Sequence, residues 1–357
     1  MSHLRHDRIP VAYTAYVGRK VYFVAALALL SGVLLVLAIA LGPVRVPASQ
    51  VLRSLAGMEA DARYQIIIHN IRLPHALAAL LAGAGLAAAG AAMQSILRNP
   101  LGSPFTLGIS QAGAFGAAFA VMLCGTGAMQ STQVGAVTIA NPWLTTASAF
   151  IACMATSLII IGIARIRGAT PEVMVLSGVA LGSLFSAGTM FLQYFADDVQ
   201  LAAMVFWTFG DVGRAGWREV AFMAVAVVFG VVFFVLNRWN YNAIDAGDET
   251  ARSLGVRVQR VRMAGMLVAS VITAVVVAFL GIIGFVGLIC PHIVRRIIGD
   301  DHRFAMPAAC LTGAILLLAS DTIARLMLAP HVLPVSILTA FLGAPTFLYL
   351  LIQRRRR

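Results

Sequence analysis

The chain has 357 residues, of which 60% are hydrophobic and only 11% are charged, and its mean hydropathy is +0.90. Soluble domains average about 45–50% apolar and about 25% charged residues, so this composition excludes a soluble globular protein and indicates a membrane protein. The net charge of +12 does not indicate a nucleic-acid-binding protein, because the basic residues lie between apolar runs and form no single stripe.

Apolar stretches of membrane-spanning length recur along the chain. A helix needs about 20 apolar residues to cross a bilayer. The first stretch, from Val21 to Leu41, is longer than the roughly 7–15-residue apolar core of a signal peptide, so we interpret it as a retained span. About ten spans are predicted: 21–42, 73–97, 104–124, 142–164, 173–194, 219–237, 263–280, 282–298, 306–324 and 333–352. The predicted fold is all-α and polytopic, with residues 1–357 forming one transmembrane domain.

The basic residues predict the orientation of these spans. With the N-terminal segment 1–20 in the cytoplasm, 19 of the 26 Lys and Arg residues fall on the cytoplasmic side and 7 fall outside. Cytoplasmic loops retain Lys and Arg, so this distribution favours an orientation with both termini in the cytoplasm.

Two loops on the predicted outer side are long. The loop 43–72 contains a short helical stretch that Ser49 is expected to cap at the membrane surface. The loop 195–218 carries Trp207 and Trp217, which are expected at the depth of the lipid headgroups.

No pattern predicts a metal site or a cofactor bound by this chain. The four cysteines lie in or beside apolar stretches without metal-ligand spacing: Cys124, Cys153, Cys290 and Cys310. They are expected to be small buried hydrophobic side chains. His292 and His302 also lack the accompanying ligands of a metal site. The chain has no GxxxxGK[ST] phosphate loop, so it is not expected to hydrolyse ATP itself.

A charged segment, 238–262, interrupts the apolar pattern on the predicted cytoplasmic side. Asp248 suits the N-cap of a helix, Glu249 suits its positive N-terminal end, and Gly255 suits the C′ position. The helix between them has about six residues, roughly 9 Å, and is too short to be stable alone in water. It therefore needs packing partners. The residues alone leave open a solvated connector and a docking element for a cytoplasmic protein.

The stretch "GDETARSLGV" (247–256) resembles the coupling segment of the FecCD-type permeases, the membrane subunits of ABC importers for iron–siderophore complexes, haem and vitamin B12. Further stretches match family segments in the same order, over about residues 70–352: "IRLPHALAALLAGAGLAAAGAAMQSILRNPLGSPFTLGIS" (71–110), "LSGVALGSLFSA" (176–187), "GFVGLICPHIVRRIIGDDHR" (284–303), "SDTIARL" (320–326) and "LPVSILTAFLGAPTFLYLL" (333–351). The resemblance implies a homodimer of ten-span subunits in the prokaryotic cytoplasmic membrane. It also implies two ATP-binding-cassette ATPase subunits inside, which would bind ATP and Mg, and a substrate-binding protein outside.

The resemblance further implies which residues serve the inner side. The ATPase would contact six residues of the coupling segment: Asp248, Glu249, Ala251, Arg252, Leu254 and Gly255. A cytoplasmic gate would include Asn99, Leu101 and Thr170. Thr170 lies in "GATPEV" (168–173), which departs from the hydroxyl-rich loop of the family.

On the outer side the resemblance implies docking of the binding protein. Arg72 and Arg325 would contact acidic residues of that protein, and His75 stands where the family has a third arginine. Asp321 precedes Arg325 by four residues, which is the favourable order for a helical ion pair. A local ion pair and a functional site at the membrane boundary are both compatible with this spacing.

Together these features predict the permease subunit of an ABC importer for an iron complex, either a siderophore complex or haem. A cobalamin importer permease is the first alternative, because the family motifs are shared. A secondary transporter driven by an ion gradient would need coupling carboxylates inside the spans, and an intramembrane enzyme would need a catalytic constellation there; we find neither pattern.

Overall fold

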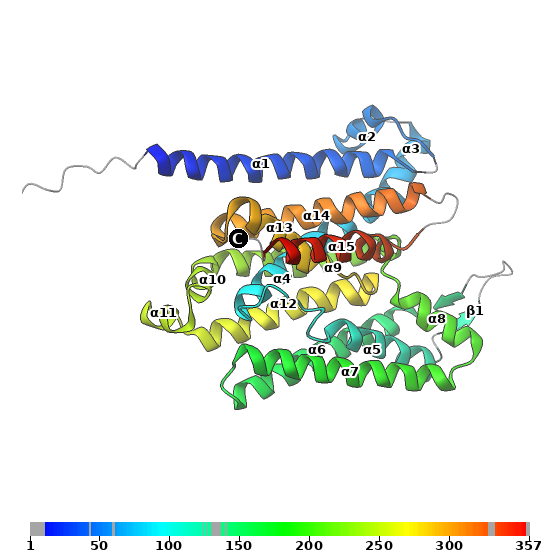
Figure 1. Cartoon of the computed structure of the whole chain (residues 1–357). Helices are drawn as coiled ribbons and strands as arrows, with labels where there is room; N and C mark the ends of the chain where they lie inside the picture. Colours follow the sequence, from blue (N-terminus) through cyan, green and yellow to red (C-terminus); the bar gives the residue numbers. More distant parts are fainter. Residues whose placement is uncertain are drawn as a thin grey trace, which may run out of the picture.

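The computed structural model describes residues 11–42, 44–58, 61–123, 125, 127–129, 137–139, 141–327 and 333–354. In it the long helices run roughly side by side as a bundle (Figure 1). The helices before the small hairpin are α1 (Val11–Ala40), α2 (Ala48–Leu55), α3 (Ala62–Ile67), the π-helical turn η1 (Ile68–Arg72), α4 (Leu73–Ile96) and α5 (Ile109–Leu123). The strands β1 (Gly127–Met129) and β2 (Val137–Ile139) pair antiparallel.

The remaining helices follow the hairpin. They are α6 (Pro142–Ile166), α7 (Pro171–Phe195), α8 (Asp198–Thr208), the 3-10 turn η2 (Val212–Arg214), α9 (Trp217–Leu236), α10 (Arg238–Asp245), α11 (Asp248–Ser253), α12 (Val258–Leu280), α13 (Val286–Ile298), α14 (His302–Met327) and α15 (Val335–Arg354).

Helix α4 lies at the centre of the bundle and is buried along most of its length. It is rich in Ala and Gly and packs against α9, α12, α13 and α14. Gly83 faces Gly313 of α14, and Gly90 faces Gly287 of α13. A Cβ added to Gly83 or Gly90 would overlap the carbonyl oxygen of the glycine opposite. Small residues therefore allow these backbones to approach closely, as is typical of helices packed within a membrane.

Seven helices among the described residues are long and apolar enough to cross a membrane: Tyr13–Ala40, Ala62–Ile96, Pro142–Ile166, Pro171–Phe195, Trp217–Leu236, Val258–Leu280 and His302–Met327. The other three predicted spans correspond to α5, α13 and α15, which are not among these seven. The prediction of an all-α polytopic membrane protein is confirmed, apart from the small β1–β2 hairpin. The number of ten crossings stays a prediction.

Several predicted boundaries differ from the structure. Residues 11–20, predicted to precede the first span, already belong to α1. Lys20 is buried there, and its ammonium lies 4.2 Å from the ring centroid of Tyr16. The third predicted span starts at 104, whereas α5 starts at Ile109, because the left-handed Gly108 (φ +77°) forms a turn before it. The division of the seventh and eighth spans after residue 280 agrees with the end of α12.

Two predictions for the outer loops are wrong. Ser49 does not cap α2, which starts at Ala48 after Pro47, so Ser49 lies inside the first turn. Trp207 is only 5% exposed and packs against α5, α6 and α12, because α8 folds back onto the bundle. Trp217, by contrast, is 47% exposed.

The prediction that the cysteines are buried is confirmed for Cys153, Cys290 and Cys310. Cys124 lies outside the described residues.

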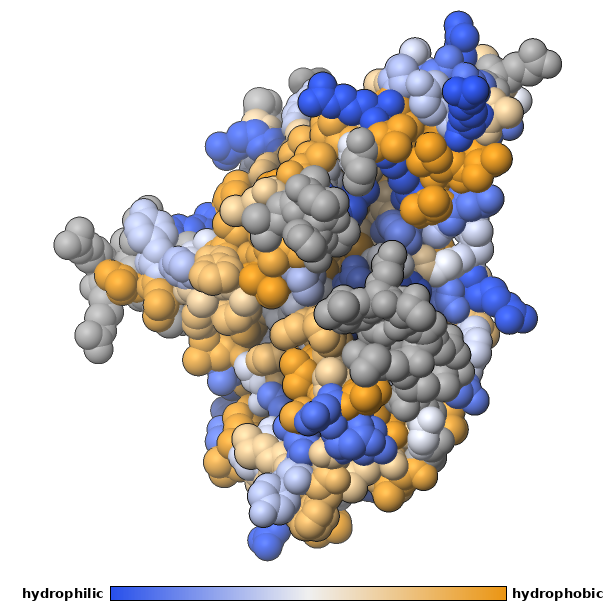
Figure 2. Space-filling model, turned by 90° about the vertical axis from the view of Figure 1, so that its right-hand side faces the viewer, coloured by the Kyte–Doolittle hydropathy of each residue, from blue (hydrophilic) through white to orange (hydrophobic). Residues whose placement is uncertain are grey.

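The two ends of the bundle carry different elements (Figure 1). The start of α1, helices α10 and α11, and the end of α15 lie at one end, which we call the α11 end. Helices α2, α3 and α8 and the hairpin lie at the opposite end, which we call the α2 end. Figure 2 looks onto the α2 end and shows hydrophilic residues scattered among hydrophobic ones.

Candidate functional site

The charged segment 238–262 forms α10, α11 and the start of α12 at the α11 end. Gly255 follows α11 in the left-handed conformation (φ +84°). Its amide donates to the carbonyl of Arg252, and the amide of Val256 donates to the carbonyl of Ala251, both at 2.9 Å. This pair of bonds satisfies the last carbonyls of the helix, and the prediction of Gly255 at C′ is confirmed.

The prediction of Asp248 as the N-cap is wrong, because α11 starts at Asp248 itself. Gly247 precedes it with φ +121°, a conformation that glycine adopts readily. The Asp248 carboxylate does not turn back onto the helix amides. It accepts hydrogen bonds from the Arg262 guanidinium at 3.0 and 3.2 Å. A glycine and an ion pair therefore set the direction in which α11 starts.

Helix α11 presents most of the residues expected to contact an ATPase. Four of the six are exposed: Glu249, Arg252, Leu254 and Gly255. Leu254 is 69% exposed, so an apolar side chain stands beside an acid and a base. Ala251 is fully buried and packs in a small cluster with Ile244 and Val258, which anchors the helix to α10 and α12.

Arg262 joins α11 to two other parts of the protein. It is 2% exposed. Besides its ion pair with Asp248, its Nε donates to the carbonyl of Ile96 at 2.8 Å, and one terminal nitrogen donates to the carbonyl of Ala169 at 2.9 Å. One side chain thus links α11, the last turn of α4 and the loop between α6 and α7. Charge-assisted bonds of this kind are strong in a buried setting.

A second cluster joins α10 to the same turn of α4. The Ser95 hydroxyl lies 3.0 Å from a carboxylate oxygen of Asp245 and 2.8 Å from Nε2 of His302. That nitrogen also lies 2.9 Å from the same Asp245 oxygen. Helix α10, through Asp245, and the start of α12, through Arg262, are therefore bonded to consecutive residues of α4, Ser95 and Ile96.

The start of α14 continues this cluster. The His302 amide donates to Oδ1 of Asn242 at 2.8 Å, and the Asn242 side-chain amide donates to Asp301 at 3.1 Å. Arg303 forms an ion pair with Asp301 at 2.7 Å. Burial works against ionisation of Asp301, but the hydrogen bonds from Arg303 and Asn242 outweigh it and lower the pKa of this carboxyl to about 2.

The predicted gate residues lie directly beyond these bonded turns. After α4, Arg98 adopts a left-handed conformation (φ +46°), and the Asn99 side chain accepts a hydrogen bond from the amide of Leu101 at 2.9 Å. Leu101 is 41% exposed. Thr170 is exposed and caps α7 by accepting from the amide of Val173. Arg262 contacts the residue before Thr170 and the last residue of α4, so it lies between both parts of the predicted gate.

At the α2 end the predicted docking arginines are bonded to the end of α1. Arg72 is 5% exposed and donates to the carbonyls of Ile39 at 2.7 Å, Ala40 at 2.9 Å and Val44. Arg325 donates to the carbonyl of Ala38 at 3.1 Å and pairs with Asp321 at 2.9 Å. The favourable i,i+4 ion pair is thus present.

The two arginines donate to the last carbonyls of α1, where the helix has no amide partners of its own, although the Ala40 carbonyl also accepts from the amide of Val46 at 3.1 Å. A contact between Arg72 and another protein would require this side chain to leave those carbonyls. His75 is half-buried, with Arg325 and Asp211 as its charged neighbours. The docking roles stay predictions.

Three residues of these contacts are not singled out by the sequence: Ser95, Asp245 and Arg262. A basic residue at the start of an apolar helix looks like an ordinary cytoplasmic charge. The sequence does contain one signal for a buried role of Arg262, which is its position one turn inside α12. An arginine there has to find hydrogen-bond acceptors within the protein.

Comparisons with known proteins show the family of this chain. The model of the FecCD transport family matches residues 29–353. A Methanocaldococcus jannaschii protein assigned as an ABC transporter permease is 52% identical over 98% of this chain and 99% of its own length. The hemin transport system permease of Yersinia pestis is 36% identical, over 83% of this chain and 86% of its own. The cobalamin import system permease of Halobacterium salinarum is 38% identical, over 82% and 75%.

A solved structure supports the same assignment. A transporter assigned to the metal-chelate type of ABC transporters, in an inward-facing conformation, superposes with a TM-score of 0.80 at 28% identity, covering 92% of this chain and 98% of that one. The family match over most of the chain, the similar sequences and the shared fold agree with one another. This chain belongs to the FecCD transport family and is a multi-pass ABC importer permease of the cytoplasmic membrane.

Proposed function

We propose that this chain forms the transmembrane pathway of an importer for an iron complex, a siderophore complex or haem. Two copies of the chain assemble around the pathway. Two ATP-binding-cassette subunits bind the α11 end and hold the ATP and Mg, and a substrate-binding protein binds the α2 end. The chain itself performs transport and no hydrolysis.

The observation that carries this proposal is the exposed helix α11 held by Arg262 to the last turn of α4. A six-residue helix has little stability of its own, so its shape depends on these contacts. Because Arg262 bonds both Asp248 and Ile96, a displacement of α11 shifts the turn that carries Asn99 and Leu101. Movement driven by nucleotide binding would reach the gate through this connection.

The cargo is proposed from the similar proteins. The hemin permease and the metal-chelate type transporter favour an iron complex. Cobalamin is the second candidate, because the cobalamin import system permease of Halobacterium salinarum is 38% identical. Uptake of a ferric siderophore, haemin and cobalamin, compared in the same vesicles, separates these candidates.

The test reconstitutes the chain in liposomes with the ATPase and binding protein encoded beside it. Wild type is compared with Glu249→Arg plus Arg252→Glu, a charge exchange between two exposed side chains. We expect ATP-dependent uptake in the wild type, and loss of both ATPase association and uptake in the variant. Unchanged association in the variant would contradict the coupling role of α11, and uptake that does not need ATP would indicate a gradient-driven carrier.

A matched variant at the α2 end controls for the charge exchange. Asp198→Arg plus Arg45→Glu also exchanges two exposed charges and leaves the net charge unchanged. We expect this variant to bind the ATPase as the wild type does.

A further inference from the structure

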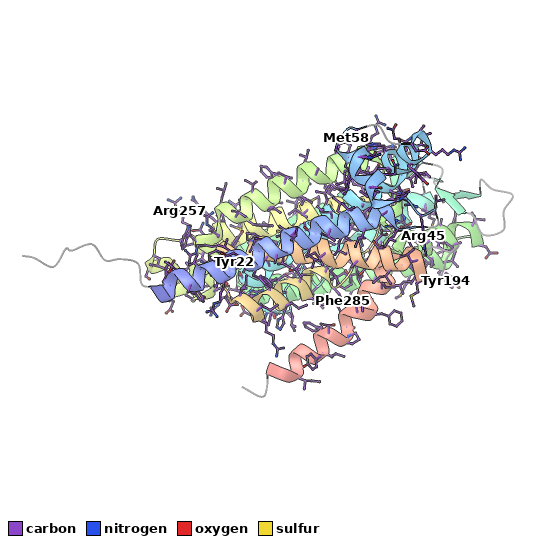
Figure 3. All side chains as sticks on the ribbon, turned by 90° about the horizontal axis from the view of Figure 1, so that it is seen from above. Tyr22, Arg45, Met58, Tyr194, Arg257 and Phe285 are labelled. Atoms are coloured by element: carbon purple, nitrogen blue, oxygen red, sulfur yellow. The ribbon has the colours of Figure 1, made fainter. Side chains whose placement is uncertain are left out.

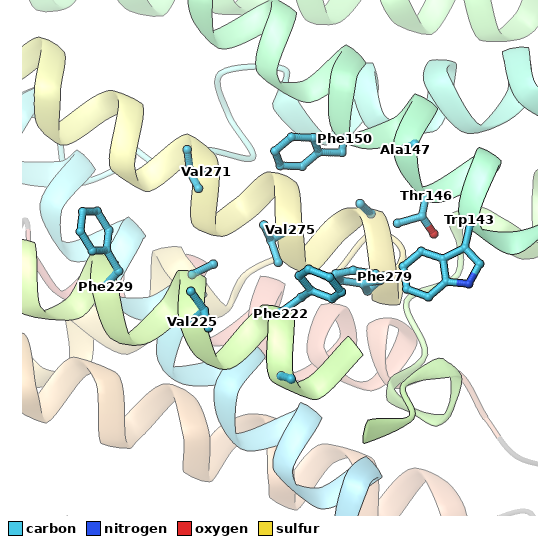
Figure 4. Close-up of a pocket in the computed structure, with 13 residues that line it drawn as sticks. Trp143, Thr146, Ala147, Phe150, Phe222, Val225, Phe229, Val271, Val275 and Phe279 are labelled. Atoms are coloured by element: carbon cyan, nitrogen blue, oxygen red, sulfur yellow. The ribbon is translucent and has the colours of Figure 1, made fainter. Parts of the chain in front are cut away.

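An apolar groove runs along the side of the bundle where α6 and α9 both pack against α12 but hardly touch each other. Its volume is about 720 Å³, which is in the range of small-molecule binding sites. Helix α12 forms the floor, and α6 and α9 form the walls (Figure 4). Its bulky lining side chains are Trp143, Phe150, Phe222, Phe229, Val271 and Phe279.

The groove faces away from the buried centre of the bundle. Helix α9 exposes large apolar side chains along its length: Phe222, Val225, Val228, Phe229 and Val232. In a membrane protein such a surface is in contact with lipid. An occupant of the groove therefore comes from the bilayer itself.

The polarity of the groove changes along its axis. Towards the α2 end it continues into a second cavity of about 540 Å³, which shares Trp143 and Phe279 with it. This cavity is also lined by Arg214 and Glu219. One end of the combined space thus suits a polar group and the other end suits a hydrocarbon chain.

Arg218 lines neither cavity but lies beside Trp143, which lines both, and is therefore a cation next to the polar end. It is exposed, and its guanidinium carbon lies 5.9 Å from the ring centroid of Trp143. Within the described part of the chain no carboxylate forms an ion pair with it. Arg214, by contrast, donates to three backbone carbonyls at the end of α8. Arg218 therefore remains free to bind an anion.

We propose that this groove binds one diacyl phospholipid from the leaflet at the α2 end. One acyl chain lies between α6 and α9, over the roughly 10 Å from Phe222 to Phe229, and continues into the bilayer. The phosphate binds Arg218 through a charge-assisted hydrogen bond. Trp143 and Trp217, 45% and 47% exposed, lie where tryptophans flank lipid headgroups. The lipid fills the space that α6 and α9 leave above α12.

The test is native mass spectrometry of the full-length chain purified in mild detergent, titrated with dioleoyl phosphatidylglycerol or with dioleoylglycerol, which lacks the phosphate. We expect one retained phospholipid per chain and weaker retention of dioleoylglycerol. Val225→Trp places an indole in the groove and is expected to abolish retention. Val228→Trp, on the same helix but outside the groove, is the matched control and is expected to retain the lipid.

Arg218 tests the headgroup separately. Arg218→Ala is expected to remove the preference for the phospholipid over dioleoylglycerol, and Arg218→Lys is expected to keep it. Equal retention by wild type and Val225→Trp would overturn the proposal. A second result would also overturn it: a wild type that carries no lipid, together with a Val225→Trp variant that no longer self-associates. The groove would then be an interface between two copies.

Discussion

Arg262 shows how one buried side chain can organise a whole end of this protein. A guanidinium removed from water is tolerated only when its donors are used and its charge is paired. Asp248 supplies the charge, and the carbonyls of Ile96 and Ala169 supply the remaining acceptors. These three partners belong to three different segments, so the need to satisfy one arginine fixes their relative positions.

Replacing Arg262 is therefore expected to disturb both stability and coupling. Arg262→Gln leaves Asp248 without its partner, and since the Asp248 side chain keeps 26% exposure we expect a loss of about 2–3 kcal/mol. The measurement is thermal unfolding of the purified protein together with ATP-dependent uptake in liposomes. Arg260→Gln removes the same charge from an exposed neighbour and should change neither. Equal melting temperatures for both variants would show that the contacts of Arg262 add no stability.

The Asp301 carboxyl predicts a pH dependence at the same end. Its pKa in the fold is about 2, below its ordinary value of 3.8, so its ionised form stabilises the protein above about pH 4. This stabilisation is lost as the pH falls through 2. Asp301→Asn is expected to reduce the fall in melting temperature between pH 4 and pH 2, and Asp300→Asn, at the exposed position beside it, is the control. An unchanged pH profile in Asp301→Asn would contradict the assignment.

At the scale of elements, α4 determines how the long helices pack. Its glycines and alanines allow α13 and α14 to approach to backbone contact. Its last turn carries Ser95, whose hydroxyl donates to Asp245 of α10, and Ile96, whose carbonyl accepts from Arg262 of α12. A helix that is packed tightly along its length and bonded at its end is expected to move as a unit, and the proposed coupling through α11 relies on this.

The close approach of α4 and α13 is expected to tolerate no side chain at Gly90. A Cβ there would lie 1.9 Å from the Gly287 oxygen, and its neighbours are backbone atoms that cannot rotate away. We expect Gly90→Val to destabilise the protein by about 3 kcal/mol. The amount of monodisperse protein in size-exclusion chromatography after heating measures this. Gly162→Val, where nothing lies within 4 Å, should behave as wild type.

At the scale of the whole molecule, both ends of the described chain lie at the α11 end (Figure 1). This agrees with an even number of crossings. The excess of Lys and Arg predicts that this end is cytoplasmic. Figure 3 shows Met58 near the α2 end and Arg257 near the α11 end, so these two positions report the orientation.

Cysteine labelling tests that orientation. With the four native cysteines replaced by alanine, Met58→Cys and Arg257→Cys are expressed without the ATPase and treated with a membrane-impermeant maleimide. Met58 is 62% exposed and Arg257 is exposed, so both thiols should react once accessible. We expect labelling of position 58 in intact cells, and of position 257 only after permeabilisation. The reverse pattern would mean that the α11 end faces outward.

The sequence by itself determined the class of the protein and the position of the short exposed helix α11. Runs of about 20 apolar residues form membrane-spanning helices, because a backbone without hydrogen-bond partners in lipid is too costly. Gly255 ends α11 as predicted, because glycine adopts a positive φ readily. The motifs of the family also lie along the chain and can be recognised without coordinates.

Only the tertiary structure decided which charged side chains form contacts inside the protein. In the sequence Asp248 looks like a helix cap and Arg262 looks like a cytoplasmic charge. The fold brings a guanidinium nitrogen of Arg262 to 3.0 Å from a carboxylate oxygen of Asp248. Arg72 and Arg325 look like surface residues until the end of α1 lies against them. Trp207 looks like a headgroup anchor until α8 folds back. The physical reason is the same in each case: a polar or aromatic side chain is satisfied by whatever group packs beside it, and that neighbour comes from a distant part of the chain.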